Sequence, residues 1–267
     1  MSADTTPTPV RSSWRMPNWL ESILGQLIAL GIAIIGGAIL IILVGEDPIL
    51  VFTTLLRGAF GNSERIAGSL LQATPIIIAG VAACIALRGG LFNIGVEGQL
   101  YMGGFAAAFV GFQFALPTGL HMLVALAAAV VAGGLWILIP AFFRARFGTN
   151  EVVSTILSNY VAILLTSYFT IDVFKRPGGW SETDPVATTA YLPQLFEFSR
   201  LNFGLFIGLA LAIGFHLFLT RTSRGYDMNT MGANMKFAEY GGIAVKRNIL
   251  VILLCSGAVG GLAGGVE

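Results

Sequence analysis

Seven windows of about 20 mostly apolar residues recur along the chain, and segments of this length can cross the hydrocarbon core of a bilayer. They cover residues 24–44, 67–87, 99–115, 121–140, 152–171, 203–220 and 249–266. Lipid offers no partner for backbone polar groups, so such windows are expected to form helices. The sequence therefore predicts an all-α, polytopic transmembrane helical bundle of about seven spans.

Composition supports a membrane protein. Hydrophobic residues make up 55% of the chain and charged residues 11%, against about 25% charged in soluble domains. The net charge of +1 gives no reason to expect nucleic acid, and two histidines are too few for most metal centres. His121 and His216 lie near span ends and are interpreted as interfacial side chains. Cys84 and Cys255 lie in apolar runs and are interpreted as buried small residues.

Residues 1–22 are polar and predict a cytoplasmic N-terminal tail. The apolar run that follows is too long for a signal peptide, so it is expected to remain as the first span. Residues 23–267 form the predicted transmembrane domain. Its last segment, SGAVGGLAGGVE, carries glycines four residues apart, a spacing that lets helices pack closely. A chain seldom stops inside such a helix, so this domain is expected to be incomplete at its C-terminus.

Charge is distributed unequally between the two predicted sides of the membrane. With the tail inside, ten Lys and Arg residues fall on the inner side and five on the outer side, in agreement with the positive-inside rule. On the outer side, residues 47–63 predict a short helix at the membrane surface. Residues 172–200 form the longest outer connection, which is either a contact for an extracytoplasmic binding protein or a solvated connector.

Residues 88–104, RGGLFNIGVEGQLYMGG, interrupt the apolar pattern. Glycine lets a chain leave helical geometry, and unwound backbone at membrane depth is tolerated only in protein or beside a wet cavity. The segment therefore predicts a discontinuous helix beside a transport path. The residues assigned to the helix break are Gly89, Gly90, Gly95 and Gly98.

Polar residues near this break allow two interpretations. Asn93, Glu97 and Gln99 either line the substrate path or serve the structure, with Asn93 capping the restarted helix and Glu97 close to its positive end. Thr155 and Asn159 begin a polar stripe on the fifth span that either lines the path or joins helices.

The inner segment 221–248 contains a second pattern. Asn234 can cap a short helix over residues 234–240, which Gly241 or Gly242 can end. Met231, Met235 and Ala238 would share one face, which suits insertion into a groove on a partner. A helix lying on lipid headgroups is the alternative.

Three stretches resemble a known family. Residues 87–104, with the motif GLFNIGVEGQ, together with 148–160 and 224–247, resemble permeases of ATP-binding-cassette importers for nucleosides, simple sugars and branched-chain amino acids, closest to the nucleoside branch. The resemblance implies a permease subunit that moves a nucleoside or simple sugar by alternating access, driven by a separate ATPase. The coupling residues that it implies are Asn234, Ala238, Glu239, Tyr240 and Gly242.

The same resemblance implies ATP-binding subunits on the cytoplasmic side, a second permease subunit, an extracytoplasmic substrate-binding lipoprotein and a bacterial inner-membrane location. The chain has no G-x-x-x-x-G-K-[ST] phosphate loop, so ATP is expected on the partner and no cofactor on this chain. No motif supplies a nucleophile with a nearby base, so enzymatic catalysis is not expected. A secondary transporter for a small polar solute is the alternative function.

Overall fold

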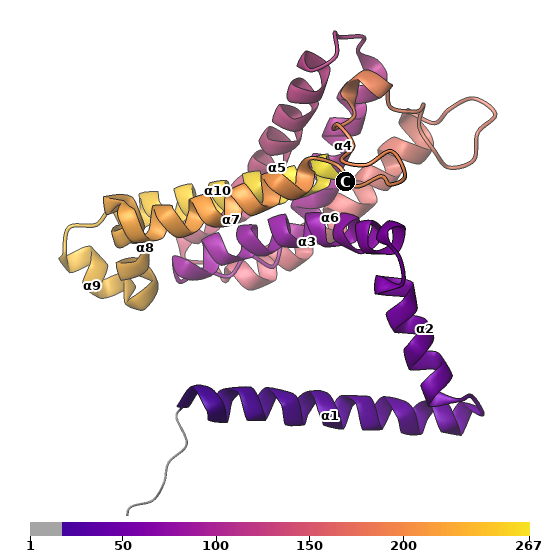
Figure 1. The fold of residues 1–267 in the computed structure, drawn as a ribbon. Helices are drawn as coiled ribbons and strands as arrows, with labels where there is room; N and C mark the ends of the chain where they lie inside the picture. The colour runs from indigo at the N-terminus through magenta and orange to yellow at the C-terminus, as the bar shows by residue number, and fades with distance from the viewer. Residues whose placement is uncertain (1–17) are drawn as a thin grey trace, which may run out of the picture. The chain divides into compact units, whose positions relative to one another are not determined.

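The computed structural model describes residues 18–267, and helices dominate this part of the chain (Figure 1). They fall into two units, one ending at Gly61 and one running from Asn62 to Glu267. Most of the predicted N-terminal tail, residues 1–17, lies outside the described residues.

The first unit consists of two helices, α1 (Asn18–Val44) and α2 (Pro48–Phe60). α1 contains the first predicted span. α2 begins at a proline directly after Asp47, whose carboxylate accepts a hydrogen bond from the Ile49 N–H at 2.9 Å, as an N-cap should. The short helix predicted within residues 47–63 is therefore present.

The second unit contains six long helices. These are α3 (Ser63–Arg88), α4 (Val96–Gln113), α5 (Leu120–Phe147), α6 (Glu151–Tyr168), α7 (Gly204–Arg221) and α10 (Val245–Val266). Four short helices complete it: the π-helix η1 (Phe169–Val173), the 3₁₀-helix η2 (Thr188–Ala190), α8 (Ser223–Ala233) and α9 (Met235–Tyr240).

The prediction of a polytopic helical bundle is confirmed in the described residues. Six of their helices, α1 among them, are long and apolar enough to cross a membrane, which agrees with a polytopic helical bundle. The seventh predicted span, residues 99–115, corresponds to α4. This helix is 18 residues long but falls outside that group, because Glu97, Gln99 and Gln113 lower its hydropathy.

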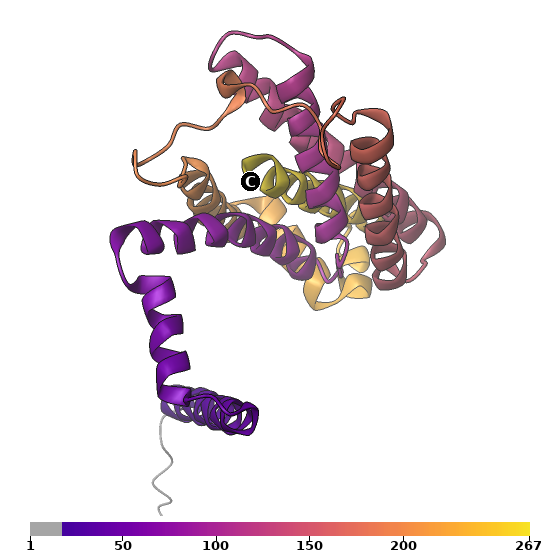
Figure 2. The ribbon, with the colours of Figure 1, turned by 90° about the vertical axis from the view of Figure 1, so that its right-hand side faces the viewer.

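Helix α10 lies at the centre of the second unit and packs against α3, α4 and α5 (Figure 2). Glycines make this close packing possible. Gly261 approaches the backbone of Gly103 in α4 and of Gly133 in α5, and Gly264 approaches Gly104 in α4. The glycine spacing therefore marks a packing interface, as the sequence predicts.

The long helices of the second unit run alternately toward and away from one common end. α3, α5 and α7 finish where α4, α6 and α10 begin, and α8 and α9 lie at this end, which we call the α9 end (Figure 1). The long connection between η1 and α7 lies at the opposite end. Basic residues gather at the α9 end, which agrees with the predicted inner side. They are Arg88, Arg144, Arg146, Arg221, Arg224, Lys236, Lys246 and Arg247.

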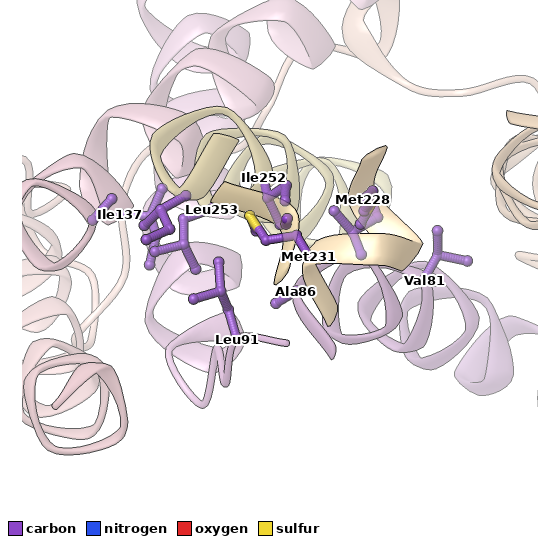
Figure 3. Close-up of a cluster of buried hydrophobic side chains, with 12 residues drawn as sticks. Val81, Ala86, Leu91, Ile137, Met228, Met231, Ile252 and Leu253 are labelled. Carbon is purple, nitrogen blue, oxygen red and sulfur yellow. The ribbon is translucent and has the colours of Figure 1, made fainter. Parts of the chain in front are cut away.

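A buried hydrophobic cluster joins the short helices at the α9 end to the long ones (Figure 3). Met231 of α8 is completely buried and belongs to the same cluster as Ala86 of α3 and Leu253 of α10. Leu91, which lies between α3 and α4, is also completely buried in this cluster. α8 is therefore part of the packed bundle.

The interpretation of both cysteines as buried residues is wrong. Cys84 in α3 and Cys255 in α10 are exposed on the surface of the chain. A helix facing lipid is as apolar on its outside as on its packed side, so an apolar sequence context does not indicate burial.

The central glycine contact yields a test of this packing. We expect Gly261→Ala to destabilise the bundle by about 1–3 kcal/mol, because the added methyl group would overlap the backbone of α5 at Ala129 and Gly133. Gly214→Ala in α7 is the matched control, since nothing lies within 4 Å of a Cβ there. Thermal unfolding of the purified protein in detergent measures both, and equal midpoints for the two variants would contradict the packing.

Candidate functional site

The predicted break is present, but the assignment of Gly98 to it is wrong, because Gly98 lies in the first turn of α4. α3 ends at Arg88 and α4 begins at Val96, so residues 89–95 leave helical geometry between them. Gly90 has φ of +71°, a left-handed conformation that favours glycine, and a Cβ there would lie 3.0 Å from the Cα of Gly232 in α8. The glycine is therefore required both by its backbone angle and by the close approach of α8.

The break reverses the direction of the chain. Along α10, Ile252 lies beside Gly89 and Ser256 beside Ala82, so α3 runs opposite to α10. In α4, Gln99 lies beside Gly260 and Gly104 beside Gly264, so α4 runs in the same direction as α10. The discontinuity therefore joins two helices that flank α10.

Asn93 fixes the break to α10 and α4. Its amide nitrogen donates to Ser256 Oγ at 2.8 Å and to Gln99 Oε1 at 3.0 Å, and Gln99 Nε2 donates back to Asn93 Oδ1 at 3.0 Å. Ser256 Oγ in turn donates to the carbonyl of Ala82 at 2.6 Å. All three polar side chains are buried. Ser256 lies about 16 Å along α10 from its first residue, so this network sits deep in the bundle.

α4 receives its N-terminal cap from another helix. Its N-cap residue is Gly95, and the prediction that Asn93 caps it is wrong, because Asn93 Oδ1 accepts from the Gly95 N–H at 3.0 Å instead. The cap comes from Asn159 of α6, whose Oδ1 accepts from the Gly98 N–H at 2.9 Å while its Nδ2 donates to the Ile94 carbonyl at 2.9 Å. One amide thus satisfies a carbonyl of the break and an N–H in the first turn of α4.

The polar stripe of α6 packs against α4. Thr155, Asn159, Ala162 and Thr166 are all buried. The hydroxyl of Thr155 donates to the carbonyl of Glu151 at 2.7 Å and that of Thr166 to the carbonyl of Ala162 at 2.9 Å. These two hydroxyl bonds stay within α6, so Asn159 provides the hydrogen bonds from the stripe to Gly98 and Ile94. Its bonds and the burial of the stripe favour the interpretation that the stripe joins helices.

Glu151 holds the break from the α9 end, a role that the sequence analysis did not identify. Its side chain is 8% exposed, and its Oε2 lies 3.2 Å from Nε of Arg144 at the end of α5. Its Oε1 accepts from the Phe92 N–H at 3.4 Å. The carboxylate therefore links the ends of α5 and α6 to the backbone of the break. The basic residues near Glu151 in the sequence were the only available signal.

Glu97 differs from the other polar residues of the break. It is exposed, and it forms no hydrogen bond or ion pair with any residue from 18 to 267. Its neighbour Gly98 contacts Asn159, which lies about 12 Å along α6 from Glu151. An ionisable side chain at such depth is costly unless it faces water, a solute or another polypeptide. Tyr101, one turn further along α4, is 43% exposed.

A phenylalanine cluster continues from this region toward the opposite end. Phe105 of α4 stacks on Phe169 of η1 at 5.3 Å between ring centroids, and Phe109 meets Phe174 edge to face at 5.2 Å. Sequence reasoning missed this cluster, because its two halves lie about 60 residues apart and only the spacing of the α4 phenylalanines could have signalled it.

His121 anchors the long outer connection, and its interpretation as an interfacial side chain is wrong. It is completely buried at the start of α5, with Nδ1 2.8 Å from Thr189 Oγ1 and Nε2 3.0 Å from the carbonyl of Val110. The Ala187 N–H also donates to the carbonyl of Gly111 at 2.9 Å. Residues 187–189 are therefore bound to the ends of α4 and α5.

The short helix of the inner segment is present as predicted. Asn234 caps α9 by accepting from the Phe237 N–H at 3.0 Å, the helix ends at Gly241, and Gly242 has φ of +83°. The prediction that the face with Met231, Met235 and Ala238 enters a partner is wrong, however. Met231 and Ala238 are completely buried against the bundle, because the apolar side of α8 and α9 completes the chain's own core.

The exposed side of α9 is aromatic. Phe237 is 66% exposed and Tyr240 is 91% exposed. Glu239, between them, is also exposed.

Comparisons with known proteins agree on one class. The family model described as "Branched-chain amino acid transport system / permease component" matches residues 65–267. The chain is 35% identical over 251 residues to the guanosine ABC transporter permease protein NupP of Bacillus subtilis (strain 168), covering 93% of this chain and 72% of the relative.

Two further relatives carry different substrate names. The nucleoside ABC transporter permease protein NupB of Lactococcus lactis subsp. cremoris (strain MG1363) is 28% identical, over 93% of this chain and 71% of its own. The glucose ABC transporter permease protein TsgB13 of Haloferax volcanii is 30% identical, over 94% of this chain and 69% of its own. No solved structure matches the chain.

The cap provided by α6 gives a second prediction. We expect Asn159→Leu to destabilise the protein by about 1–3 kcal/mol for each of the two backbone groups left without a partner, the Gly98 N–H and the Ile94 carbonyl. Ser158→Ala, at the adjacent position of α6, is the control. Hydrogen exchange at residues 93–98 measures the local effect, and unchanged protection in Asn159→Leu would show that the cap does not hold the break.

Proposed function

Since this chain belongs to the family of permease components of branched-chain amino acid transport systems and is a permease subunit of an ATP-binding-cassette importer, we propose that its solute is a nucleoside or a simple sugar. Because the chain belongs to this family, the alternative function of a secondary transporter is rejected. The choice of solute is supported by the relatives, of which two are named for nucleosides and one for glucose.

The exposure of Glu97 is the observation that carries the proposed path. Of the five residues assigned to the path, Asn93, Gln99, Thr155 and Asn159 are buried and hydrogen-bonded within the chain. Glu97 alone remains exposed beside the break. We assign Glu97 to the solute path, where its carboxylate accepts hydrogen bonds from hydroxyl groups of a ribose or sugar. The four buried residues hold the break in shape.

The α9 end is proposed to bind the ATP-binding subunits, on the cytoplasmic side. There the coupling loop, residues 221–248, presents Phe237, Glu239 and Tyr240, while Asn234 and Gly242 shape α9. Ala238 supports this loop from inside the core. ATP would be held by those subunits, so this chain needs no cofactor of its own.

The coupling loop and the break are in direct contact, which suggests how ATP drives transport. Ala238 of α9, Met231 of α8 and Leu91 of the break share one buried cluster. A displacement of α9 by an ATPase would therefore reach the break through packed side chains. Alternation between outward-open and inward-open states is the proposed result.

The remaining assignments follow the family. We propose a bacterial inner-membrane location with residues 1–22 as a cytoplasmic tail, a second permease subunit, and a substrate-binding lipoprotein at the end that carries the long connection. The described helices support a multi-pass membrane protein. The distribution of basic residues supports the orientation.

Transport assays test the role of Glu97. In vesicles containing the complete transporter, we expect Glu97→Gln to lower the initial rate of guanosine or glucose uptake at least tenfold, because a neutral amide cannot replace a charge-assisted hydrogen bond. Glu46→Gln, which changes an exposed acidic residue between α1 and α2, should transport normally. Uptake by Glu97→Gln at the wild-type rate would show that this residue does not line the path. If the unmodified protein transports neither solute, the proposed solute class is refuted.

Association with the ATPase tests the α9 end. We expect Tyr240→Ala to weaken binding of the ATP-binding subunit at least tenfold, because exposed aromatic side chains commonly dominate an interface. Tyr191→Ala is the control, since Tyr191 is 56% exposed in the long connection at the opposite end. Binding of the purified subunits reports the change, and equal affinities for both variants would exclude α9 as the contact.

A further inference from the structure

Helix α4 has a surface that does not suit lipid. Among the helices of at least 18 residues in the described part of the chain, it alone is not apolar enough to be a candidate span. Gln99 is buried, but Glu97 and Gln113 are exposed near its two ends, and Tyr101 is 43% exposed. Gln113 is the last residue of α4, where a polar side chain can reach the interface, but an exposed carboxylate such as Glu97 does not suit contact with lipid tails. The exposed face of α4 therefore requires a different neighbour.

This face changes character along its length. Glu97, Tyr101, Phe105 and Phe109 follow one another at intervals of four residues, and Phe112 comes three residues later, so helical periodicity aligns them. The acid and the phenol lie toward the α9 end. The phenyl rings lie toward the opposite end and are only partly buried. We call this set the α4 ladder.

The π-helix η1 brings further rings to the ladder. Its wider turn is closed by the Phe174 N–H, which donates to the carbonyl of Phe169 at 2.8 Å. Phe169 lies nearly parallel to Phe105, with 22° between the ring planes, and Phe174 lies 6.1 Å from Phe105 and 5.2 Å from Phe109. Single π-helical turns occur frequently at functional sites. Here the turn continues the aromatic surface from α4 onto the end of α6.

We propose that the α4 ladder is a wall of the solute path and that its rings stack on the base of a nucleoside in transit. The proposal rests on the proposed function and narrows its solute to nucleosides. A nucleoside has a flat base and a polar ribose, which match the aromatic and polar parts of the ladder. Aromatic side chains stack on any nucleobase. Glucose has no base to stack, so it would use only the polar part.

Uptake kinetics of the complete transporter test this assignment. We expect Phe105→Leu and Phe169→Leu to lower kcat/KM for guanosine at least fivefold and for uridine less, because a purine offers a larger stacking surface. Phe105→Trp should retain guanosine uptake. Phe143→Leu is the matched control, since Phe143 belongs to a separate cluster with Phe142 and Phe147 at the end of α5.

The outcomes separate the two proposals. If the unmodified transporter carries glucose but not guanosine, the base-stacking assignment fails while the proposed function stands. If guanosine uptake is normal in the leucine variants, or if guanosine and glucose uptake fall by the same factor, the rings do not recognise a base. If neither solute is carried, the proposed function itself fails.

Accessibility of Tyr101 gives a measurement that does not depend on turnover. In a Cys84→Ala, Cys255→Ala background, Tyr101→Cys should react with a charged methanethiosulfonate reagent at least tenfold faster than Ile139→Cys, which replaces a 64% exposed residue of α5. Guanosine, presented by the substrate-binding protein, should slow the reaction at Tyr101→Cys. A cysteine there that never reacts would place this face against lipid or a second permease subunit and overturn the proposal.

Discussion

The break between α3 and α4 depends on finding hydrogen-bond partners for the polar backbone of seven non-helical residues within a membrane-spanning bundle. A membrane helix meets this requirement by itself, but residues 89–95 cannot. Two helices, α6 and α10, supply the missing partners. Within the break, Asn159 of α6 serves the Ile94 carbonyl and Glu151 serves the Phe92 N–H, while Ser256 of α10 holds Asn93 in place. The break is therefore a built part of the structure.

Small residues make these hydrogen bonds geometrically possible. Ser256 reaches both Asn93 and the carbonyl of Ala82 because α10 lies close to its neighbours. That closeness comes from glycines such as Gly261, where a side chain would collide with the backbone of another helix. Since lipid provides little hydrophobic drive for helices to associate, close packing and interhelical hydrogen bonds must provide the stability. The glycines thus bring the helices close enough for the polar network to form, and the hydrogen bonds of that network help to hold the helices together.

Local sequence patterns predicted local structure well. Apolar windows predicted the spanning helices, glycines predicted the break, and Asn234 predicted the start of α9. Contacts between distant segments were not predictable, since one sequence does not show which residues meet. Asn159 caps a helix through a residue 61 positions away, and His121 binds Thr189 across 68 positions. Hydropathy also failed to distinguish lipid from core, as the exposed Cys84 shows.

The contact between α8 and the break involves backbone on both sides. Gly232 meets Gly90 and the carbonyl of Arg88 with no side chain between them. Where side chains lie between two elements, they can change rotamer, so one element can move slightly without displacing the other. A contact between two glycines has no side chain that could adjust in this way. A shift of α8 toward α3 must therefore be matched by an almost equal shift of residues 89–95.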